Sequence, residues 1–254
     1  MSERMDLSEL GFDDLEQVTP EKSEVTTEIR EGGLIVKDEG KGISISIPVR
    51  SEEEIAEYER QEKEIKDFEK MEAYKNSGVP KKFFSESLDT FKPENEDDAF
   101  ALGIIRNFVK APKNKVILMY GESGNGKSHL ACGAVREMGG QFRMSEDICV
   151  EYDSASDFNA KRTRAEVLNY YVTRKLLVID EMMKYTIKPQ LEAWILSYII
   201  RMRYENNLPT ILIKNGSKRE FSDFVGTAVN DRLKECCTSI EFKGESHRVK
   251  EIEF

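Results

Sequence analysis

The chain has 254 residues, of which 39% are hydrophobic and 34% charged, with four cysteines and two histidines. This composition is typical of a soluble protein with one sizeable α/β domain and an additional segment. No apolar run approaches the roughly 20 residues that cross a bilayer, and no basic segment followed by an apolar one opens the chain. We therefore expect a cytoplasmic protein that does not bind membranes, and the absence of a C-x-x-C pair argues against a zinc site.

Charge is unevenly distributed along the chain. Residues 1–100 carry 28 acidic and 14 basic side chains, a balance of −14, whereas residues 101–254 have a balance of +4. An acidic segment repels nucleic acid, while a slightly basic one does not. The asymmetry predicts two modules with different partners; alternatively, the acidic residues only keep a mobile segment soluble.

The first 77 residues contain weak signals followed by one strong helix. Residues 1–33 are polar and acidic, so we expect them to be largely disordered apart from a short helix near Leu7–Leu15. Residues 34–49 predict a hairpin of two short strands around a glycine-containing turn. Ser51 and Glu54 then form a capping box, which predicts a helix over 51–77 that Gly78 can end.

This helix has an apolar stripe. Its members fall near one face of the helix and are Ile55, Tyr58, Ile65, Phe68 and Met71. Such a stripe is most often a face that packs on the chain's own core, and the alternative is a helix that binds a partner.

From about residue 101 the pattern alternates between strands and helices, which predicts a parallel sheet with helices on both faces. The expected strands are 115–120, 142–144, 175–180, 210–214 and 239–242. The expected helices are 127–137, 165–172, 189–204, 218–224 and 228–235.

The first of these strands leads into a nucleotide-binding loop. Residues 121–128 read GESGNGKS and match the pattern G-x-x-x-x-G-K-[ST], with an apolar strand before and a helix after. The glycines let backbone N–H groups approach a phosphate, and the helix directs its positive end at it. Lys127 is expected to contact the β- and γ-phosphates of ATP and Ser128 to bind Mg²⁺. The expected nucleotide-binding residues are Gly121, Glu122, Ser123, Gly124, Asn125, Gly126, Lys127, Ser128 and His129.

A second strand supplies the acidic half of the site. The apolar run of residues 175–179 ends in Asp180 and Glu181. Burying unpaired acids costs free energy, so packing alone does not explain two carboxylates at the end of a buried strand. We expect Asp180 to hold Mg²⁺ and Glu181 to orient the attacking water. A third strand ends at Asn215, which is either a sensor of the γ-phosphate or simply a turn residue before Gly216.

Residues 78–254 resemble the DnaC/DnaI helicase-loader branch of the AAA+ ATPases, which includes the IstB transposition helper. The resemblance begins with GVPKKF at 78–83 and continues through GESGNGKSHLACGA and LLVIDE. Residues 198–204 and Leu208-Pro209-Thr210 follow, and the more specific elements are NDRL at 230–233 and GESHR at 244–248.

The resemblance implies an AAA+ P-loop fold with a parallel five-stranded sheet and no C-terminal helical lid. It implies that Arg232 is an arginine finger reaching a neighbouring subunit in a head-to-tail assembly, and that Arg248 is a second sensor. Three positions depart from the family pattern, and they bear on the identity of the partner more than on the nucleotide chemistry. They are residues 182–185 in place of a small, glycine-containing turn, Lys214 in place of Ser or Thr, and His247 in place of Tyr.

The implied function is a loader that uses ATP to place a DnaB-type hexameric helicase on single-stranded DNA. Residues 1–77 would be the partner-binding region and residues 78–254 the ATPase domain. The alternatives are an IstB-like helper of a transposase and a nucleotide-dependent adaptor that does not contact DNA. Lys161, Arg162 and Arg164 could meet DNA phosphates, lie at a subunit interface or form a solvated turn, and the sequence shows no basic motif interleaved with aromatic residues.

Overall fold

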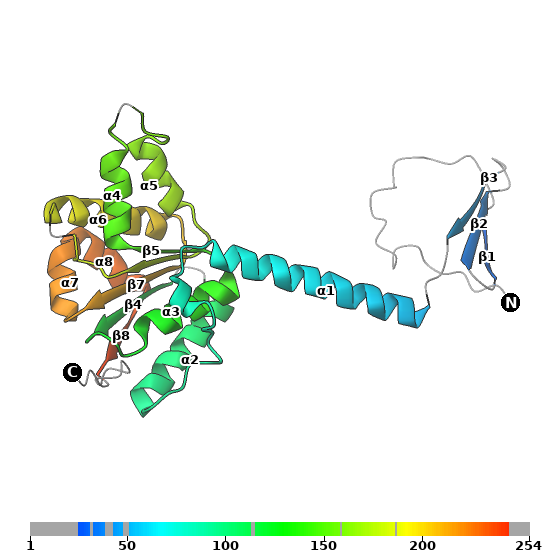
Figure 1. Cartoon of the computed structure of the whole chain (residues 1–254), viewed down its shortest axis with the longest axis horizontal. Helices are drawn as coiled ribbons and strands as arrows, with labels where there is room; N and C mark the ends of the chain where they lie inside the picture. Colours follow the sequence, from blue (N-terminus) through cyan, green and yellow to red (C-terminus); the bar gives the residue numbers. More distant parts are fainter. Residues whose placement is uncertain are drawn as a thin grey trace, which may run out of the picture. The chain divides into compact units, whose positions relative to one another are not determined.

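A computed structural model describes residues 25–30, 33–38, 43–47, 51–112, 115–157, 159–185 and 187–243 (Figure 1). The short helix expected near residues 7–15 lies outside the described residues. So does the segment 244–254, which contains Arg248 and on which the expectation of no C-terminal helical lid depends. The chain divides into two compact units, Met1–Ile65 and Lys66–Phe254.

The first unit contains a three-stranded antiparallel sheet in the order β1-β2-β3, formed by β1 (Val25–Arg30), β2 (Gly33–Asp38) and β3 (Ile43–Ile47). Strands β2 and β3 correspond to the predicted hairpin. Strand β1 lies in the stretch that was expected to be largely disordered, and the sequence did not predict it. A third strand is what a marginal two-stranded hairpin needs to become more stable.

Helix α1 (Glu52–Lys75) begins at the predicted capping box. The backbone N–H of Glu54 donates to Ser51 Oγ at 3.2 Å, and the Ser51 N–H donates to Glu54 Oε2 at 2.8 Å. The apolar stripe is largely exposed, from 45% at Ile55 to 68% at Phe68, and only Met71 packs on the core. Packing on the chain's own core is therefore the wrong interpretation for most of this stripe, because only the last turns of α1 are buried.

The second unit is built on the predicted five-stranded parallel sheet. Its strands are β4 (Val116–Gly121), β5 (Gln141–Met144), β6 (Leu177–Asp180), β7 (Thr210–Asn215) and β8 (Cys237–Phe242). Their order is β5-β6-β7-β4-β8, and every pairing is parallel. This is a P-loop fold of the AAA+ type, in which one strand, β7, separates the P-loop strand β4 from the acidic strand β6.

Helices cover both faces of this sheet (Figure 1). One face carries α2 (Glu96–Lys110) and α3 (Lys127–Met138). The other carries α4 (Ser145–Ser154), α5 (Arg164–Val172), α6 (Pro189–Glu205), α7 (Lys218–Val225) and α8 (Thr227–Cys236). Helices α2 and α4 were not predicted. Throughout the described part of the chain, each helix is too short or too polar to cross a membrane.

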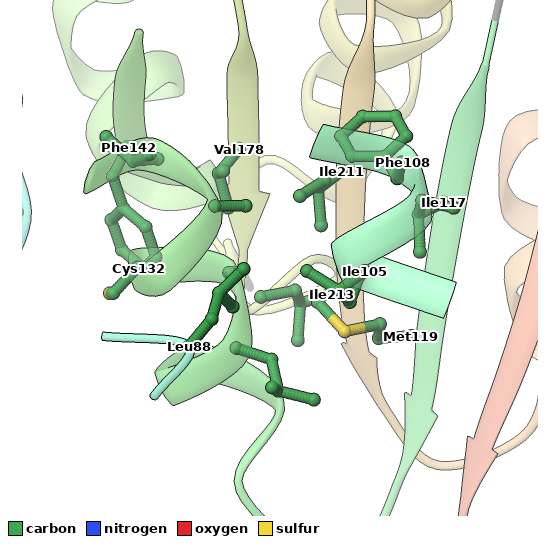
Figure 2. Packing of buried hydrophobic residues seen from close by; sticks show 14 of the residues in the cluster. Leu88, Ile105, Phe108, Ile117, Met119, Cys132, Phe142, Val178, Ile211 and Ile213 are labelled. Carbon is green, nitrogen blue, oxygen red and sulfur yellow. The ribbon is translucent and has the colours of Figure 1, made fainter. Parts of the chain in front are cut away.

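The sheet places alternate residues of its three central strands, β6, β7 and β4, in two separate cores. On β4, Ile117 and Met119 pack beneath α2 and α3 (Figure 2), whereas Val116 and Leu118 face the other helices. Each fully buried side chain of this kind stabilises the fold by roughly 1.5–3 kcal/mol. The strand ends that carry the functional residues are thus fixed by packing on both sides.

A buried arginine holds the edge of the sheet at which the strands begin. Arg203 of α6 is 0% exposed. Its guanidinium donates to five acceptors at 2.6–3.0 Å, which are the carbonyl oxygens of Tyr171, Val172, Arg174 and Pro209 and the hydroxyl of Thr210. Burial lowers the pKa of this guanidinium to about 9. The side chain therefore ties the end of α5 to the start of β7.

Candidate nucleotide-binding site

The loop between β4 and α3 has a backbone that requires glycine. Gly121 has φ 129°, and a Cβ there would lie 2.2 Å from the carbonyl oxygen of Phe242. Gly126 has φ 86°, and a Cβ there would lie 2.6 Å from the ring of Phe91. Both positions combine a left-handed backbone with close packing, so a side chain at either would displace the loop.

Lys127 begins α3 and is 4% exposed. Its ammonium donates to the carbonyl oxygen of Gly121 at 3.0 Å and to that of Glu122. A buried lysine needs acceptors, and two carbonyls of the loop provide them here. The same ammonium lies at the positive N-terminal end of α3, where phosphate oxygens are favoured acceptors.

Ser128 and Asp180 meet across the sheet edge. The Ser128 hydroxyl donates to Asp180 Oδ2 at 2.7 Å, and the Glu181 N–H donates to Asp180 Oδ1 at 2.7 Å. Burial raises the pKa of the Asp180 carboxyl, while these two hydrogen bonds act in the opposite direction. A hydroxyl and a carboxylate side by side are oxygen ligands of the kind that Mg²⁺ prefers, so this pair fits the expected metal.

The chain leaves β6 through a turn with left-handed residues. Glu181 has φ 53° and Met183 has φ 69°, although neither is glycine. The buried carboxylate of Glu192 accepts the N–H groups of Met183 at 2.8 Å and Tyr185 at 3.1 Å. This carboxylate explains how a methionine occupies a turn for which a small residue was expected, because it offsets the backbone strain with two hydrogen bonds.

Asn215 lies at the end of β7, directly beside the P-loop. It pairs with Gly121 in the parallel register, and the N–H of Gly216 donates to the carbonyl oxygen of Gly121 at 3.3 Å. The preceding Lys214 points to the other face of the sheet, where its ammonium donates to Glu220 Oε2 at 2.6 Å and to the carbonyl oxygen of Asn215 at 2.7 Å. The turn after Asn215 is therefore fixed by a buried ammonium and a carboxylate.

These residues surround a cleft of about 490 Å³, a size typical of nucleotide sites. The predicted residues that line it are Ser123, Gly124, Gly126, Lys127, Ser128, His129, Asp180, Glu181 and Asn215. Gly121 and Glu122 support the loop from behind through their carbonyl groups, and the buried Asn125 donates to the carbonyl oxygen of Phe242 at 3.3 Å. Thus not every residue of the motif lines the cleft.

The opposite wall of the cleft comes from residues 82–94, which sequence reasoning did not assign to the site. This wall includes Lys82, Phe83, Glu86, Thr90, Phe91, Lys92 and Glu94. Two side chains of α3 hold it: His129 Nε2 lies 3.0 Å from the carbonyl oxygen of Ser87, and Arg136 donates to that of Glu86 at 3.1 Å. His129 therefore belongs to the site mainly as the link between the P-loop helix and this wall. The GVPKKF match at residues 78–83, which includes Lys82 and Phe83, was the sequence signal from which this wall could have been predicted.

Arg232 lies elsewhere. It is a partly exposed residue of α8 that does not line the cleft, and its guanidinium donates to the carbonyl oxygen of Ala228 at 2.8 Å. It also pairs with Glu205, at the end of α6, at 3.9 Å. The structure therefore does not bring Arg232 to its own P-loop, and the position of Arg248 is not described.

Residues 53–253 match the family model of the IstB-like ATP-binding protein. The chain belongs to this family. The match spans the P-loop, the acidic strand end and Asn215, and with the sheet order it makes the second unit an AAA+ domain that is DnaC-like and IstB-like. None of the curated proteins matches the sequence.

Solved structures share the fold of this unit. The crystal structure of the DnaC helicase loader is 25% identical with a TM-score of 0.57, over 65% of this chain and 100% of that chain. DnaI is 17% identical with a TM-score of 0.54, over 66% and 94% of the two chains. The replication initiator DnaA bound to AMPPCP and single-stranded DNA is 20% identical with a TM-score of 0.53, over 66% of this chain and 51% of that chain.

Proposed function

We propose that this protein hydrolyses ATP with Mg²⁺ and uses the cycle to load a hexameric DnaB-type helicase on single-stranded DNA. The observation that carries the ATPase proposal is the meeting of Lys127, Ser128, Asp180 and Glu181 around one cleft. The likeness to the crystal structure of the DnaC helicase loader, over the whole of that solved chain, supports the loading role.

In this mechanism the loop amides and Lys127 bind the β- and γ-phosphates, and Lys127 exchanges the carbonyls of Gly121 and Glu122 for phosphate oxygens. Ser128 and Asp180 hold Mg²⁺, which neutralises charge on the phosphates. Glu181 accepts a proton from the attacking water and orients it, and Asn215 senses the γ-phosphate from the tip of β7. Arg232 of one subunit stabilises the charge that develops in the site of the next.

The N-terminal region, residues 1–77, is the part proposed to contact the helicase. The stripe on α1 supports this, because Ile55, Tyr58, Ile65 and Phe68 are 45–68% exposed on a helix whose other residues are mostly charged. Exposed apolar side chains in a row on one helix face are typical of helix-in-groove recognition.

A second candidate function is an ATP-dependent helper of a transposase. The match to the IstB-like family over residues 53–253 favours it, since that family is defined by an ATP-binding unit like the one here. The two functions differ in the protein that α1 and the strands before it would contact.

Glu181→Gln tests the hydrolysis step. We expect this variant to bind ATP within about twofold of the wild type and to lose turnover by at least 100-fold, because only the proton-accepting carboxylate is removed. Binding is measured by calorimetry and turnover by phosphate release. Wild-type turnover in Glu181→Gln would contradict the role of this carboxylate.

The partner is tested by co-purification of the full chain with a DnaB-type helicase, in parallel with Phe68→Glu and with Phe100→Glu, which places the same charge on an equally exposed phenylalanine of α2. We expect the wild type and Phe100→Glu to retain the helicase and Phe68→Glu to lose it. Failure of the wild type to bind the helicase, together with capture of a transposase, would replace the loader by the second candidate.

A further inference from the structure

Five side chains form a continuous stack on the surface of the second unit. The ring centroids of Tyr152 in α4 and Trp194 in α6 lie 5.7 Å apart. Trp194 also stacks on Tyr198 of the same helix, with 5.8 Å between the ring centroids and an interplanar angle of 22°. The guanidinium groups of Arg164 and Arg201 lie over the two outer rings, at 5.1 and 5.6 Å. We call this set the aromatic–arginine stack.

The stack is exposed although it is rich in apolar area. Trp194 is 50% exposed, and Tyr152 and Tyr198 are partly buried. Tryptophan, tyrosine and arginine are the residues that contribute most to binding energy in protein interfaces, and an exposed patch of them on a folded unit marks an interaction surface.

The stack continues to Arg232 along the exposed side of α6. Arg201 pairs with Glu205 at 3.7 Å, and Glu205 pairs with Arg232 at 3.9 Å. The same surface therefore carries the apolar stack at one end and, at the other, the arginine that the proposed function requires in a neighbour's site.

We propose that the aromatic–arginine stack is the Arg232 side of the interface between two copies of this chain, and that it docks beside the nucleotide cleft of the next copy. This inference rests on the proposed head-to-tail assembly. The wall of the cleft includes the carboxylates of Glu86 and Glu94, which are complementary in charge to the arginines of the stack. A surface that meets a different surface of an identical chain builds open or ring-shaped assemblies.

Stacking of DNA bases is the competing occupant, and one observation argues against it. The ring spacings are those of direct aromatic contact, so no base fits between the rings. The sequence concealed this cluster, because Tyr152 and Trp194 are far apart in the chain.

Trp194 is the only tryptophan of the chain, so its fluorescence reports directly on this surface. The full chain is titrated from dilute to concentrated solution with Mg-AMPPCP, in parallel with Lys127→Ala. We expect a blue shift and at least a twofold loss of acrylamide quenching as the wild type assembles, and no change in Lys127→Ala. Assembly, seen by sedimentation, without a change at Trp194 would overturn the proposal.

Three variants complete the test by sedimentation with Mg-AMPPCP. Trp194→Glu is expected to weaken assembly at least tenfold with unchanged ATP affinity, whereas Trp194→Phe retains most of it. Phe68→Glu places the same charge on an exposed aromatic position of α1 and is expected to assemble like the wild type. If the wild type assembles and Trp194→Glu assembles equally, the interface assignment is wrong and the proposed function stands. If Trp194→Glu assembles normally but loses binding to poly-dT, the surface binds DNA instead.

The proposed assembly itself fails in a different way. A wild-type chain that stays monomeric with Mg-AMPPCP at every concentration, alone and with poly-dT, would overturn both the head-to-tail arrangement and this interface.

Discussion

The two edges of the five-stranded sheet each contain a buried cation, and the two cations are held differently. At the edge where the strands end, Lys127 donates to two carbonyls of a glycine-rich loop. At the edge where they begin, Arg203 donates to five acceptors from two separate segments, 171–174 and 209–210. Both side chains are almost completely removed from solvent.

The difference separates the lysine proposed to bind phosphate from an arginine that stabilises the fold. The carbonyls that Lys127 contacts belong to its own loop, so a ligand can replace them without moving a strand. The acceptors of Arg203 lie at the end of α5 and the start of β7. Of these, the Pro209 carbonyl also accepts the Leu177 N–H at 3.4 Å, but loss of the guanidinium would leave the other buried acceptors unsatisfied. One cation is therefore available for exchange with phosphate, and the other is committed to the fold.

The largest effect is expected from Arg203→Met. The substitution leaves the carbonyls of Tyr171, Val172 and Arg174 and the hydroxyl of Thr210 without this donor. At roughly 1–3 kcal/mol for each acceptor, the loss is comparable to the whole stability of a domain. We expect the protein to be largely unfolded, as measured by circular dichroism and urea titration.

Arg203→Lys is the matched variant, since it keeps the charge and three of the donors. It should fold with a clearly lower urea midpoint than the wild type. Equal midpoints for wild type, Arg203→Lys and Arg203→Met would show that this edge does not depend on the guanidinium.

The second effect, on binding alone, is expected from Lys127→Ala. Loss of the ammonium should weaken Mg-ATP binding at least 100-fold, because it removes the positive charge that spans two phosphates. The urea midpoint without nucleotide should change little, and calorimetry and urea titration measure the two quantities. If the urea midpoint of Lys127→Ala fell as far as that of Arg203→Lys, Lys127 would also be a structural residue and the comparison would be wrong.

The P-loop edge could be predicted from sequence and the Arg203 edge could not. Lys127, Ser128, Asp180 and Glu181 occur in short local patterns whose chemistry is recognisable without neighbours. Arg203 was noted only as part of a family motif, because its acceptors come from residues about 30 positions earlier in the chain. Burial by distant segments leaves no local signal.

Contacts between distant segments also explain why the sequence did not predict two other features of the second unit. Residues 82–94 line the cleft and are held there by side chains of α3, and the stack around Trp194 is built from three helices, α4, α5 and α6. Helix α2 was a different case, since Asn95 caps it with a 2.8 Å bond from the N–H of Asp98 and the pattern was present in the sequence. Strand β1 had no such signal in its polar surroundings.

The smallest effect is expected from Glu220→Gln, at a third cation, Lys214. The Lys214 hydrogen bond, with those from Ser217, lowers the pKa of the Glu220 carboxyl to about 2. The substitution weakens the ion pair but keeps an acceptor, so we expect a small decrease in the urea midpoint. Lys214→Met in the same chain should recover part of it, because no buried ammonium remains.

The pH dependence of this difference follows from the sign of the shift. A carboxyl with a depressed pKa stabilises the fold above its unfolded value of 4.5, and this contribution is lost as the pH falls toward 2. The midpoints of wild type and Glu220→Gln should differ by a constant amount from pH 8 to 5 and converge from pH 4.5 to 3. A constant difference down to pH 3 would contradict the ion pair.

The position of β4 has a consequence for synthesis of the chain. Within the described sheet β4 pairs only with β7 and β8, so Val116 meets Thr210 and Cys237 and no strand made earlier. At 5–20 residues per second the ribosome needs roughly 5–20 s to pass from residue 116 to residue 210. During that time the strand that leads into the P-loop has both edges unpaired. The nucleotide loop is therefore among the last parts of the nascent domain that can form, and the newly made chain cannot bind ATP before most of its sheet has been translated.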